Sequence, residues 1–396
     1  MPRILHLGVG NFFRAHQAWY TQRCPDWRVT GVSFRSGAVR DRLAAQDYTY
    51  SLVIKDAAGT KIERITCLDG MLVMTEDPMA VISAISDPAV DVITLTVTEK
   101  AYCLASDGAL DKNNPAIRAD IDGGSLTPIG ALVRGLAGRT TPVTVLSCDN
   151  LPDNGRKLGD AIKAFAKAAN LTIRATVTYP SCMVDRITPA TTDAIRGEAG
   201  DDMAVPTEGF TEWVIDDDFA APRPDWPGVQ WVSDVAPHEM RKLRMLNGAH
   251  SYLAYAGVLR GHTFVHEAIA DPVLRAGASG IMTEAAATLP ADVQRQAKDY
   301  AAALIARFEN PNLHHRLRQI AMDGSQKLPI RILATLTDRS GVDSPALTAA
   351  VTAWIAFVQQ EVAEGRTLDD PRADEILKAC TSSDPDAALR ALIGAS

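Results

Sequence analysis

The sequence predicts an α/β fold class, with a doubly wound parallel sheet in its N-terminal part and a mostly α-helical C-terminal domain. Apolar, β-forming runs alternate with helical patterns through the first part of the chain, which is typical of a parallel sheet with helices on both faces. A glycine turn follows the first of these runs. After Val235 no strand-like run of convincing length remains, and the apolar residues recur with helical periodicity.

Length and charge narrow the class of protein. The 396 residues suffice for two domains with separate cores. A formal charge of −8 argues against a nucleic-acid or anionic-membrane partner, because either would favour a basic surface. No apolar run approaches the ~20 residues that span a bilayer, and the N-terminus lacks the pattern of a signal peptide. The cysteines include no CxxC pair and are expected to be reduced. We therefore expect a cytoplasmic protein that binds a small molecule.

The first expected element is the strand Arg3–Leu7, followed by a turn that contains Gly8 and Gly10 and then by a helix. This order brings backbone N–H groups up to a pyrophosphate in a Rossmann-type domain. Phe13 replaces the third glycine of the GxGxxG fingerprint, so the turn alone is a weak signal. The residues expected to contact the cofactor here are Gly8, Gly10, Asn11 and Phe12.

A second strand is expected at Arg28–Phe34, where a Rossmann-type domain has its next parallel strand. An acidic residue at the end of that strand normally binds the ribose hydroxyls of the cofactor. The sequence has Arg35 there, which could accept the 2′-phosphate of NADP or could lie on a solvated loop. NAD and NADP both stay open as cofactors, with Arg35 favouring NADP.

The remaining elements of this domain follow from shorter patterns. Two β-forming runs, Tyr48–Ile54 and Lys61–Cys67, predict a hairpin attached to the main sheet. Further parallel strands are expected at Val92–Thr98, Val143–Ser147 and Ile173–Tyr179, with helices at Pro78–Ile85 and Arg156–Ala169.

Polar side chains follow three of these strands, at the ends where a doubly wound sheet binds its ligands. Thr98, Glu99 and Lys100 follow one strand and are expected to contact the cofactor. Asn150 follows the next strand, and Asp185 lies past a third. Each residue alone is of a type that chain reversals often carry, so the prediction depends on their shared placement.

An acidic, proline-rich stretch over residues 216–227 predicts a connecting loop. We therefore expect a dinucleotide-binding domain over residues 1–233 and a helical substrate-binding domain over residues 234–396. The helices expected in the second domain are His238–Tyr255, Phe264–Ala270, Gly280–Ala287, Ala291–Phe308, Leu313–Met322 and Pro345–Ala363, with two shorter ones before the end.

The stretch Glu239–His250 reads EMRKLRMLNGAH. Wound as an α-helix at roughly 100° per residue, it places Lys242, Asn247 and His250 on one arc with two leucines, whereas a surface helix separates polar from apolar faces. Burial would lower the pKa of the Lys242 ammonium and make it a usable base, and Glu239 could pass its proton towards solvent. The alternative is a helix whose cations extend to solvent, with one core histidine.

Motifs for a zinc site, a serine hydrolase or a nucleotide-phosphate loop are incomplete or absent. His262 and His266 have i, i+4 spacing and His314 and His315 are neighbours, but a zinc site would need a third ligand, and HExxH is absent. GxSxG and the Walker-type phosphate loop are absent as well. No metal is expected, and a redox enzyme without zinc needs a group such as Lys242 to move the hydroxyl proton.

Five segments in order resemble the polyol-specific long-chain dehydrogenase/reductase family, that of mannitol 2-dehydrogenase and mannonate oxidoreductase. They extend over roughly the first two thirds of the chain and read HLGVGNFFRAHQAWY, TLTVTEKAY, VLSCDNLPDNG, YPSCMVDRITP and KLRMLNGAH. The resemblance implies an N-terminal Rossmann-type domain, a mostly helical C-terminal domain, and metal-independent hydride transfer between NAD or NADP and a secondary alcohol or ketone.

The resemblance also implies roles for single residues. Lys242, which opens the KxxxxNxxH pattern, would be the general acid/base, with Asn247 and His250 as its partners. In oxidation, neutral Lys242 would remove the hydroxyl proton while hydride leaves for the nicotinamide. Asn150 and Asn247 would donate hydrogen bonds to the developing alkoxide.

Glu239 and Asp185 receive roles from the same resemblance. Glu239 would assist proton exchange with solvent, and Asp185 would contact substrate hydroxyls. The chain is shorter than typical members of the family, partly in the linker and the C-terminal domain. Substrate specificity is therefore less determined than the chemistry.

The substrate is expected to be a linear polyol or a sugar acid. The stretch RLRQIAMDGSQKLPIR could place Arg318 or Lys327 near the distal end of the substrate. A cation there suits the carboxylate of a sugar acid, which would make the protein a fructuronate or tagaturonate reductase, but it could equally bind polyol hydroxyls or be a surface residue. The polyol dehydrogenase is the first interpretation and the reductase the alternative.

Two rivals remain. A non-catalytic NAD(P)-binding sensor would be expected to have lost its base, whereas Lys242 and its partners are present. A sugar-phosphate dehydrogenase of the mannitol-1-phosphate type is disfavoured by the FRAHQ run after the glycine turn. The sequence leaves open the sugar, its stereochemistry, the direction of reaction and the oligomeric state.

Overall fold

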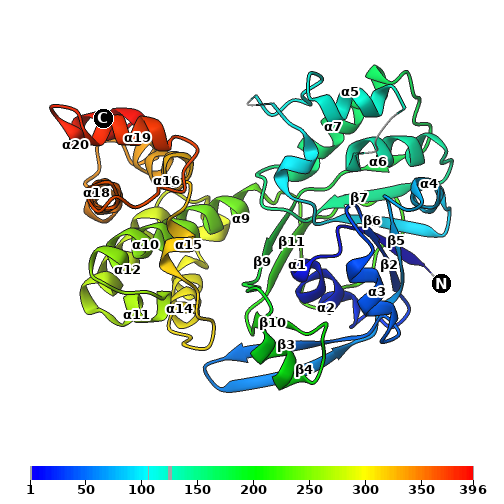
Figure 1. The fold of residues 1–396 in the computed structure, drawn as a ribbon, viewed down its shortest axis with the longest axis horizontal. Helices are drawn as coiled ribbons and strands as arrows, with labels where there is room; N and C mark the ends of the chain where they lie inside the picture. Colours follow the sequence, from blue (N-terminus) through cyan, green and yellow to red (C-terminus); the bar gives the residue numbers. More distant parts are fainter. Residues whose placement is uncertain (1, 106, 124–126, 396) are drawn as a thin grey trace. The chain divides into compact units, whose positions relative to one another are not determined.

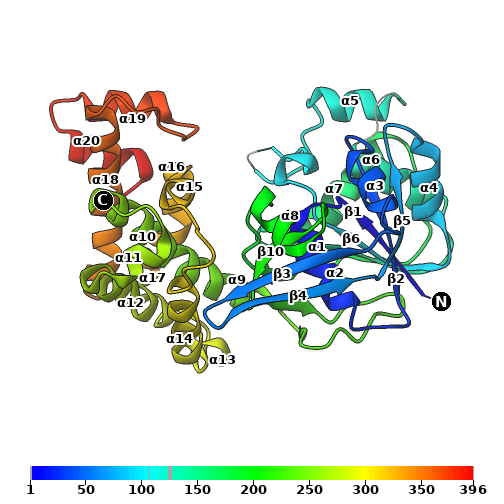
Figure 2. The ribbon, with the colours of Figure 1, turned by 60° about the horizontal axis from the view of Figure 1, so that its bottom comes forward.

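The structure is a computed structural model that describes residues 2–105, 107–123 and 127–395, without the side chains of Glu99 and Lys100. The chain divides into two compact units, Met1–Ala236 and Pro237–Ser396. Figures 1 and 2 draw the first from blue to green and the second from green to red. The sequence-based expectation places the division between residues 233 and 234.

A six-stranded parallel sheet forms the centre of the first unit, with strand order β5-β2-β1-β6-β7-β8. The order reverses between β1 and β6, so the carboxyl ends of these two strands form the switch point where such sheets bind ligands. The predicted fold class is confirmed. The strands are β1 (Arg3–Leu7), β2 (Arg28–Ser33), β5 (Leu68–Val73), β6 (Val90–Leu95), β7 (Val143–Ser147) and β8 (Val177–Thr178).

Apolar residues on alternate sides of the strands cover both faces of this sheet. Leu5 and Ile93 point to one face, where they pack with the helices α4 (Pro78–Ser86), α6 (Pro128–Ala137) and α7 (Asn154–Ala168). Ile4 and Val92 point to the other face, where they pack with a cluster rich in aromatic side chains. The other helical segments of this unit are α1 (Asn11–Ala15), α2 (Gln17–Thr21), α3 (Ala38–Ala44), η1 (Glu99–Tyr102), α5 (Pro115–Ile121) and α8 (Asp193–Ala199).

The predicted hairpin forms but does not join the main sheet, so its predicted attachment was wrong. The antiparallel strands β3 (Tyr50–Asp56) and β4 (Gly59–Ile65) belong to a separate sheet, in which β3 pairs with the parallel strand β10 (Val205–Glu208). The short run that forms β10 contains a proline and shows no strand-like alternation, so the sequence pattern does not reveal this partner. A third sheet contains β9 (Cys182–Asp185), β11 (Glu212–Asp216) and β12 (Gln230–Val232).

The second unit contains helices and no β-strand among its described residues, as predicted. Its buried core surrounds α10 (Gly248–Leu259), which packs against α12 (Pro272–Ala286), α15 (Leu317–Ala321) and α18 (Pro345–Ala363). The 19-residue α18 (Pro345–Ala363) is long and apolar enough to cross a membrane by length and composition, but half of that window is buried within the unit. It is therefore best described as a core helix.

The helical segments of this unit follow one another closely. They are α9 (Ala236–Arg241), η2 (Lys242–Asn247), α10, α11 (Val265–Ala270), α12 (Pro272–Ala286), α13 (Ala291–Gln294), α14 (Ala297–Phe308), α15 (Leu317–Ala321), α16 (Gly324–Leu328), η3 (Pro329–Leu333), α17 (Ala334–Asp338), α18, α19 (Ala373–Cys380) and α20 (Pro385–Ile393). Both η2 and η3 are π-helices.

A capped helix start explains one error of the predicted boundaries. Asp271 caps α12, with its carboxylate accepting from Val273 N and Leu274 N, so this helix begins at Pro272 and not at Gly280. An Asp-Pro or Thr-Pro pair also begins α4, α6 and α20. The predicted helix over Leu313–Met322 contracts to α15, and residues 324–338 form three helical segments that the sequence patterns did not indicate.

We predict that Gly135→Ala destabilises the first unit. A Cβ at this position of α6 would overlap Ile85 of α4, and overpacking of this kind costs about 1–3 kcal/mol of the free energy of unfolding. Five of the six tryptophans lie in this unit, so urea unfolding followed by tryptophan fluorescence measures the effect.

Gly197→Ala in α8 is the matched control. No atom lies within 4 Å of a Cβ built at Gly197, so alanine there should be neutral or stabilise by up to about 1 kcal/mol, through its higher helix propensity. Equal effects of the two substitutions would contradict this description of the α4–α6 contact.

Candidate active site

The β1–α1 turn lies at the switch point of the main sheet and needs glycine at Gly8. Gly8 has a φ of +102°, and a Cβ there would lie 3.0 Å from the Thr96 carbonyl oxygen. Its N–H donates to the Val32 carbonyl at 2.9 Å, which ties the turn to β2. A Cβ at Gly10 would meet no atom within 4 Å. The turn is therefore fixed beneath Gly8 and open above Gly10, which fits the close approach of a pyrophosphate.

Phe13, which occupies the place of the third fingerprint glycine, packs against His6. The Phe13 ring stacks on the buried His6 ring with centroids 3.6 Å apart. His6 Nδ1 lies 2.7 Å from Thr94 Oγ1, and its Nε2 lies 2.9 Å from Thr96 Oγ1. The imidazole thus fills the space beneath the turn and links β1 to β6. His6 was not among the predicted site residues, although a histidine inside an apolar strand was a visible signal.

The other two residues predicted in this turn have internal contacts. Asn11 accepts a hydrogen bond from Arg14 Nη2 at 2.7 Å and donates to Thr191 Oγ1 at 3.3 Å. Phe12 is half-buried and stacks on His16, with centroids 5.1 Å apart. Their backbone N–H groups belong to the first turn of α1, so their contribution to a cofactor site would come mainly from the backbone.

The other predicted cofactor residues follow β2 and β6, and those whose side chains are described are exposed. Arg35 lies exposed just past the end of β2, and Thr98 lies exposed past the end of β6. Glu99 and Lys100 begin η1, but their side chains lie outside the described residues. The structure thus places Arg35 and Thr98 beyond the carboxyl ends of two strands of the main sheet, as predicted for ligand contacts.

Asn150 lies in the loop before α7, and Asp185 lies in strand β9, which Asn154 ties to the start of α7. Asn154 Nδ2 donates to the Cys182 carbonyl at 2.8 Å, and Cys182 N donates to Asn154 Oδ1 at 3.0 Å. Asn150 is exposed between β7 and α7, whereas Asp185 ends β9 and is 6% exposed. Two segments that lie about thirty residues apart in the sequence are therefore neighbours in the fold.

The stretch that carries Lys242 is not a regular α-helix. Residues Lys242–Asn247 form the π-helix η2 between α9 and α10. The expected 100° per residue was therefore wrong here, because a π-helical hydrogen bond reaches five residues back and each residue advances by less. Lys242 and Asn247 are five residues apart, so the angle between their side chains around the helix axis is smaller than in an α-helix. Both side chains are half-buried.

The opposite side of this segment is anchored within the second unit. Arg244 donates to Thr288 Oγ1 at 2.6 Å and forms an ion pair with Asp338 at 2.5 Å. The Arg241 guanidinium lies 4.1 Å from the centroid of the Tyr300 ring. These arginines are buried, so they do not extend to solvent as the alternative interpretation of the helix would require.

His250 lies one turn beyond Asn247 and is 8% exposed. Its ring lies 4.5 Å from Phe308 and 5.6 Å from His315, measured between centroids. Burial, and then the charges of His315, Arg307 and Arg331, lower the pKa of His250 well below its ordinary value. His250 Nε2 has no hydrogen-bond partner in the described part of the chain. It is a neutral imidazole with an unused polar atom beside the lysine segment.

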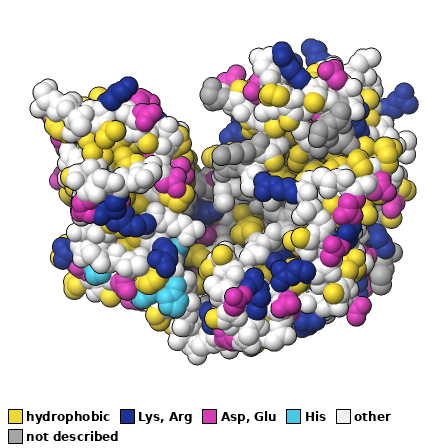
Figure 3. Space-filling model, in the orientation of Figure 1, with side chains coloured by type: hydrophobic (Ala, Val, Ile, Leu, Met, Phe, Trp, Pro, Cys, Tyr) yellow, Lys and Arg dark blue, Asp and Glu magenta, His cyan; other side chains and the backbone are white. Residues whose placement is uncertain are grey.

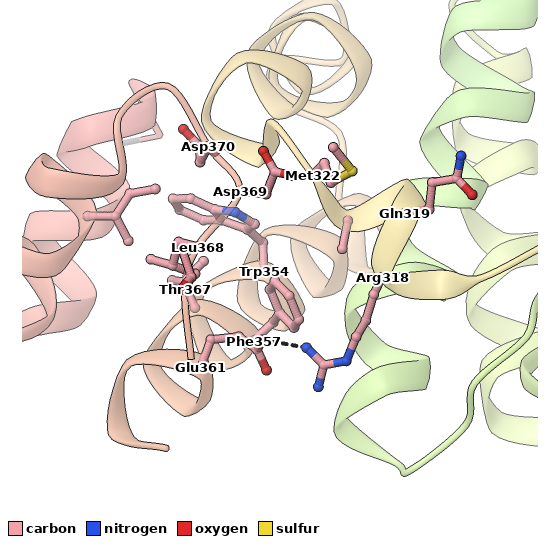
Figure 4. A pocket seen from close by; sticks show the side chains of 13 residues that line it. Arg318, Gln319, Met322, Trp354, Phe357, Glu361, Thr367, Leu368, Asp369 and Asp370 are labelled. Atoms are coloured by element: carbon pink, nitrogen blue, oxygen red, sulfur yellow. Dashed lines mark hydrogen bonds and ion pairs between the residues drawn. The ribbon is translucent and has the colours of Figure 1, made fainter. Parts of the chain in front are cut away.

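The two cations predicted to bind the substrate both contact groups of their own unit. Arg318 forms an ion pair with the buried Glu361 at the edge of a pocket of about 320 Å³, shown in Figure 4. The Lys327 ammonium donates to the Met322 carbonyl at 2.6 Å and to the Ile320 carbonyl at 3.4 Å. Burial lowers the pKa of Lys327. Their proposed role in substrate binding stays a prediction.

Histidine side chains gather on part of the surface of the second unit (Figure 3), and His266 belongs to α11. The ring of Phe264 stacks on that of His266, and His266 and His314 have centroids 6.0 Å apart. Within the described ranges, no three His, Cys, Asp or Glu side chains form a group that could hold a metal ion.

Comparison with known proteins gives matches over both units. Residues 2–228 match the model of the mannitol dehydrogenase Rossmann domain, and residues 234–393 match that of the mannitol dehydrogenase C-terminal domain. D-mannonate oxidoreductase of Escherichia coli is 38% identical, over 100% of this chain and 88% of that protein. Mannitol 2-dehydrogenase of Cereibacter sphaeroides is 36% identical, over 90% of this chain and 80% of that protein.

A solved structure agrees with these matches. Mannitol 2-dehydrogenase of Pseudomonas fluorescens, in a ternary complex with NAD and D-mannitol, has a TM-score of 0.83 and is 31% identical. The similarity covers 99% of this chain and 91% of that one.

His6 gives a testable pH dependence of stability. Burial lowers its pKa from 6.5 to about 3, so between these values the unfolded chain binds a proton at this residue and the folded chain does not. The free energy of unfolding should therefore fall as the pH falls through this window, by up to about 1.4 kcal/mol per pH unit from His6 alone.

The test compares urea unfolding of the wild-type protein and His6→Gln at pH 7.5, 6.0 and 5.0. Other groups titrate equally in both proteins, so the wild type should show the steeper loss. Parallel pH profiles would mean that His6 is not buried as a neutral imidazole.

Proposed function

The chain belongs to the mannitol dehydrogenase family, and from this premise we propose that it is an oxidoreductase that interconverts a secondary alcohol and a ketone by hydride transfer with a nicotinamide dinucleotide. The substrate class is a linear polyol or a sugar acid. The observation that carries the proposal is the KxxxxNxxH pattern on a π-helical turn, with Lys242 and Asn247 brought towards one face and a neutral His250 beyond them. A sensor that had lost catalysis would have no need of this constellation.

NAD is the cofactor that we propose, and it supplies the hydride acceptor or donor at its nicotinamide ring. Support comes from the open glycine turn at the switch point of the sheet and from the NAD in the similar mannitol 2-dehydrogenase. Gly8 and Gly10 would admit the pyrophosphate, and Arg35 would let NADP bind as well. Thr98, Glu99 and Lys100 remain proposed contacts.

Proton transfer belongs to the second unit in this proposal. Lys242 in its neutral form takes the hydroxyl proton during oxidation and returns it during reduction. Asn247 donates a hydrogen bond to the reacting oxygen, Asn150 is proposed as a further donor, and such preorganised donors contribute a few kcal/mol. His250 orients the substrate, Glu239 exchanges the proton with solvent, and Asp185 contacts a substrate hydroxyl. No step requires a metal.

Two further predictions remain part of the proposal. The expected cytoplasmic location fits the use of cysteine in the sequence, and a fructuronate or tagaturonate reductase stays the alternative within the same chemistry. The similarity to D-mannonate oxidoreductase supports that alternative as strongly as the other similarities support a polyol dehydrogenase.

The proposal is tested by following nicotinamide absorbance with purified protein, NAD or NADP, and a panel of hexitols, pentitols, ketohexoses and keto-uronates. Turnover of at least one member supports it. Tight binding of NAD without any turnover would contradict it in favour of the sensor.

We predict that Lys242→Ala lowers kcat by on the order of 10²–10⁴-fold, because the variant has no group to move the hydroxyl proton. NAD affinity, measured by calorimetry, should change by less than about threefold, since cofactor binding is assigned to the first unit. Lys298→Ala, which removes an exposed lysine from α14, is the control with expected wild-type turnover. Near-normal turnover of a folded Lys242→Ala would sink the assignment.

We also predict that Arg35→Ala separates the two cofactors. Loss of the guanidinium should raise KM for NADP by roughly tenfold, because a charge-assisted bond to the 2′-phosphate disappears, and should leave KM for NAD within about twofold. Arg118→Ala, at an exposed arginine of α5, controls for the change in net charge. A parallel change in both KM values for Arg35→Ala would show that Arg35 does not read the 2′-phosphate.

A further inference from the structure

The second unit contains two π-helical turns that pack against each other. One is η2, which carries Lys242 and Asn247, and the other is η3 (Pro329–Leu333), which carries Arg331. A Cβ built on Gly248, at the end of η2, would lie 3.6 Å from the Arg331 carbonyl oxygen. π-Helical turns are rare and occur frequently at functional sites, because they displace one or two side chains from the regular helical register.

Arg331 differs from the neighbouring arginines in its partners. Arg244 is paired with Asp338 and Arg318 with Glu361. Arg331 Nη1 donates to Ser251 Oγ at 3.1 Å, and no carboxylate of the described chain forms an ion pair with it. The acid whose charge acts on Arg331 is Asp323, which lies 3.8 Å from the Lys327 ammonium.

The Arg331 side chain is also largely withdrawn from water. It is half-buried as a whole, and its Nε is fully buried without a hydrogen-bond partner in the described chain. A guanidinium held in this way, with one neutral hydroxyl as its hydrogen-bond partner, carries a desolvation cost that no ion pair within the described chain offsets, although the charge of Asp323 reduces it. An anionic ligand would supply the missing charge and the missing acceptors.

Three other unused polar atoms lie in the same part of the unit. His250 Nε2, His315 Nδ1 and the Tyr255 hydroxyl are buried and have no hydrogen-bond partner in the part of the chain that the structure describes. The charge of Arg331 acts on His250 and on Tyr255, and the His250 and His315 rings have centroids 5.6 Å apart. Buried polar atoms are rarely left unpaired, so a cluster of them beside a catalytic segment indicates a ligand with several hydroxyl groups.

We propose that Arg331 binds the carboxylate of the substrate, and that the protein therefore acts on a sugar acid in preference to a neutral polyol. This inference rests on the proposed function and names its substrate class. The planar guanidinium matches a carboxylate with two parallel hydrogen bonds, which polyol hydroxyls cannot replace electrostatically. Arg318 and Lys327 are less suitable for this role, because the first is paired with Glu361 and the second with two backbone carbonyls.

A kinetic comparison of two substrates tests the proposal. The assay measures kcat/KM for a keto-uronate and for the neutral ketohexose of the same length, with wild type, Arg331→Gln and Arg331→Lys. The wild type should prefer the acid. In Arg331→Gln, kcat/KM should fall by about 10- to 100-fold with the acid and by less than about threefold with the ketose. Arg331→Lys keeps the charge without the planar fork, so its loss should be intermediate.

Arg316→Gln is the matched control, because it removes an exposed arginine from the same unit. It should leave both kcat/KM values unchanged. Equal losses for the two substrates in Arg331→Gln would overturn the proposal, since a merely structural role would produce them. A wild type that prefers the neutral ketose would overturn the proposal too. So would a selective loss of kcat/KM for the acid in Arg318→Gln or Lys327→Gln when Arg331→Gln shows none.

A binding measurement separates failure of this inference from failure of the proposed function. Calorimetry with NADH present measures the affinity for a hexonate, the matching hexitol and the hexitol phosphate. The hexonate should bind tightest, and Arg331→Gln should weaken it at least about tenfold without changing the affinity for the hexitol. This result would support Arg331 even if no substrate turned over. Preference for the phosphate, or an unchanged hexonate affinity in Arg331→Gln, would overturn the inference.

Discussion

The π-helical turn at Lys242–Asn247 is the constraint on which the second unit depends. It reduces the angle between two side chains five residues apart, and it does so where the chain passes from α9 to the buried α10. A wider turn is less favourable than an α-helical one, so its surroundings must hold it. Arg244 does so through Thr288 and Asp338 on one side, while η3 packs on the other.

Both units place uncharged imidazoles beside the chemistry that we assign to them. His6 lies within hydrogen-bond distance of two threonine hydroxyls beside the glycine turn, and burial lowers its pKa to about 3. His250 is neutral for the same physical reason, which is burial, but it retains an unused ring nitrogen. One histidine is therefore satisfied by the fold and the other is left for a ligand.

The fold followed from the sequence where local signals and tertiary pairing agree. Strands β1 and β7 have their predicted bounds, because an apolar run in a central parallel strand is both the local and the global preference. The placement of β3 failed because its partner β10 is short and distant in sequence. The start of α12 was missed although the Asp271-Pro272 pair was visible, and the helical patterns of the sequence did not indicate the two π-helices.

The candidate site divides in the same way. Gly8 was predicted from its position in the turn, and its positive φ agrees. The pairing of Arg318 with Glu361 could not be foreseen, because the two residues are 43 positions apart and nothing local links them. Arg331 was hidden at the end of a stretch rich in cations. Only the burial and the partners of each cation, which the fold decides, distinguish Arg331 from Arg318.

The most direct test of this account is a crystal structure of the protein with NADH and a hexonate. We predict that the carboxylate lies on the Arg331 guanidinium with two hydrogen bonds, that a carbinol oxygen lies within hydrogen-bond distance of Lys242 Nζ, and that Lys242–Asn247 keeps its π-helical turn. A hexonate carboxylate bound to Arg318 or Lys327, or a carbinol oxygen remote from Lys242, would contradict it.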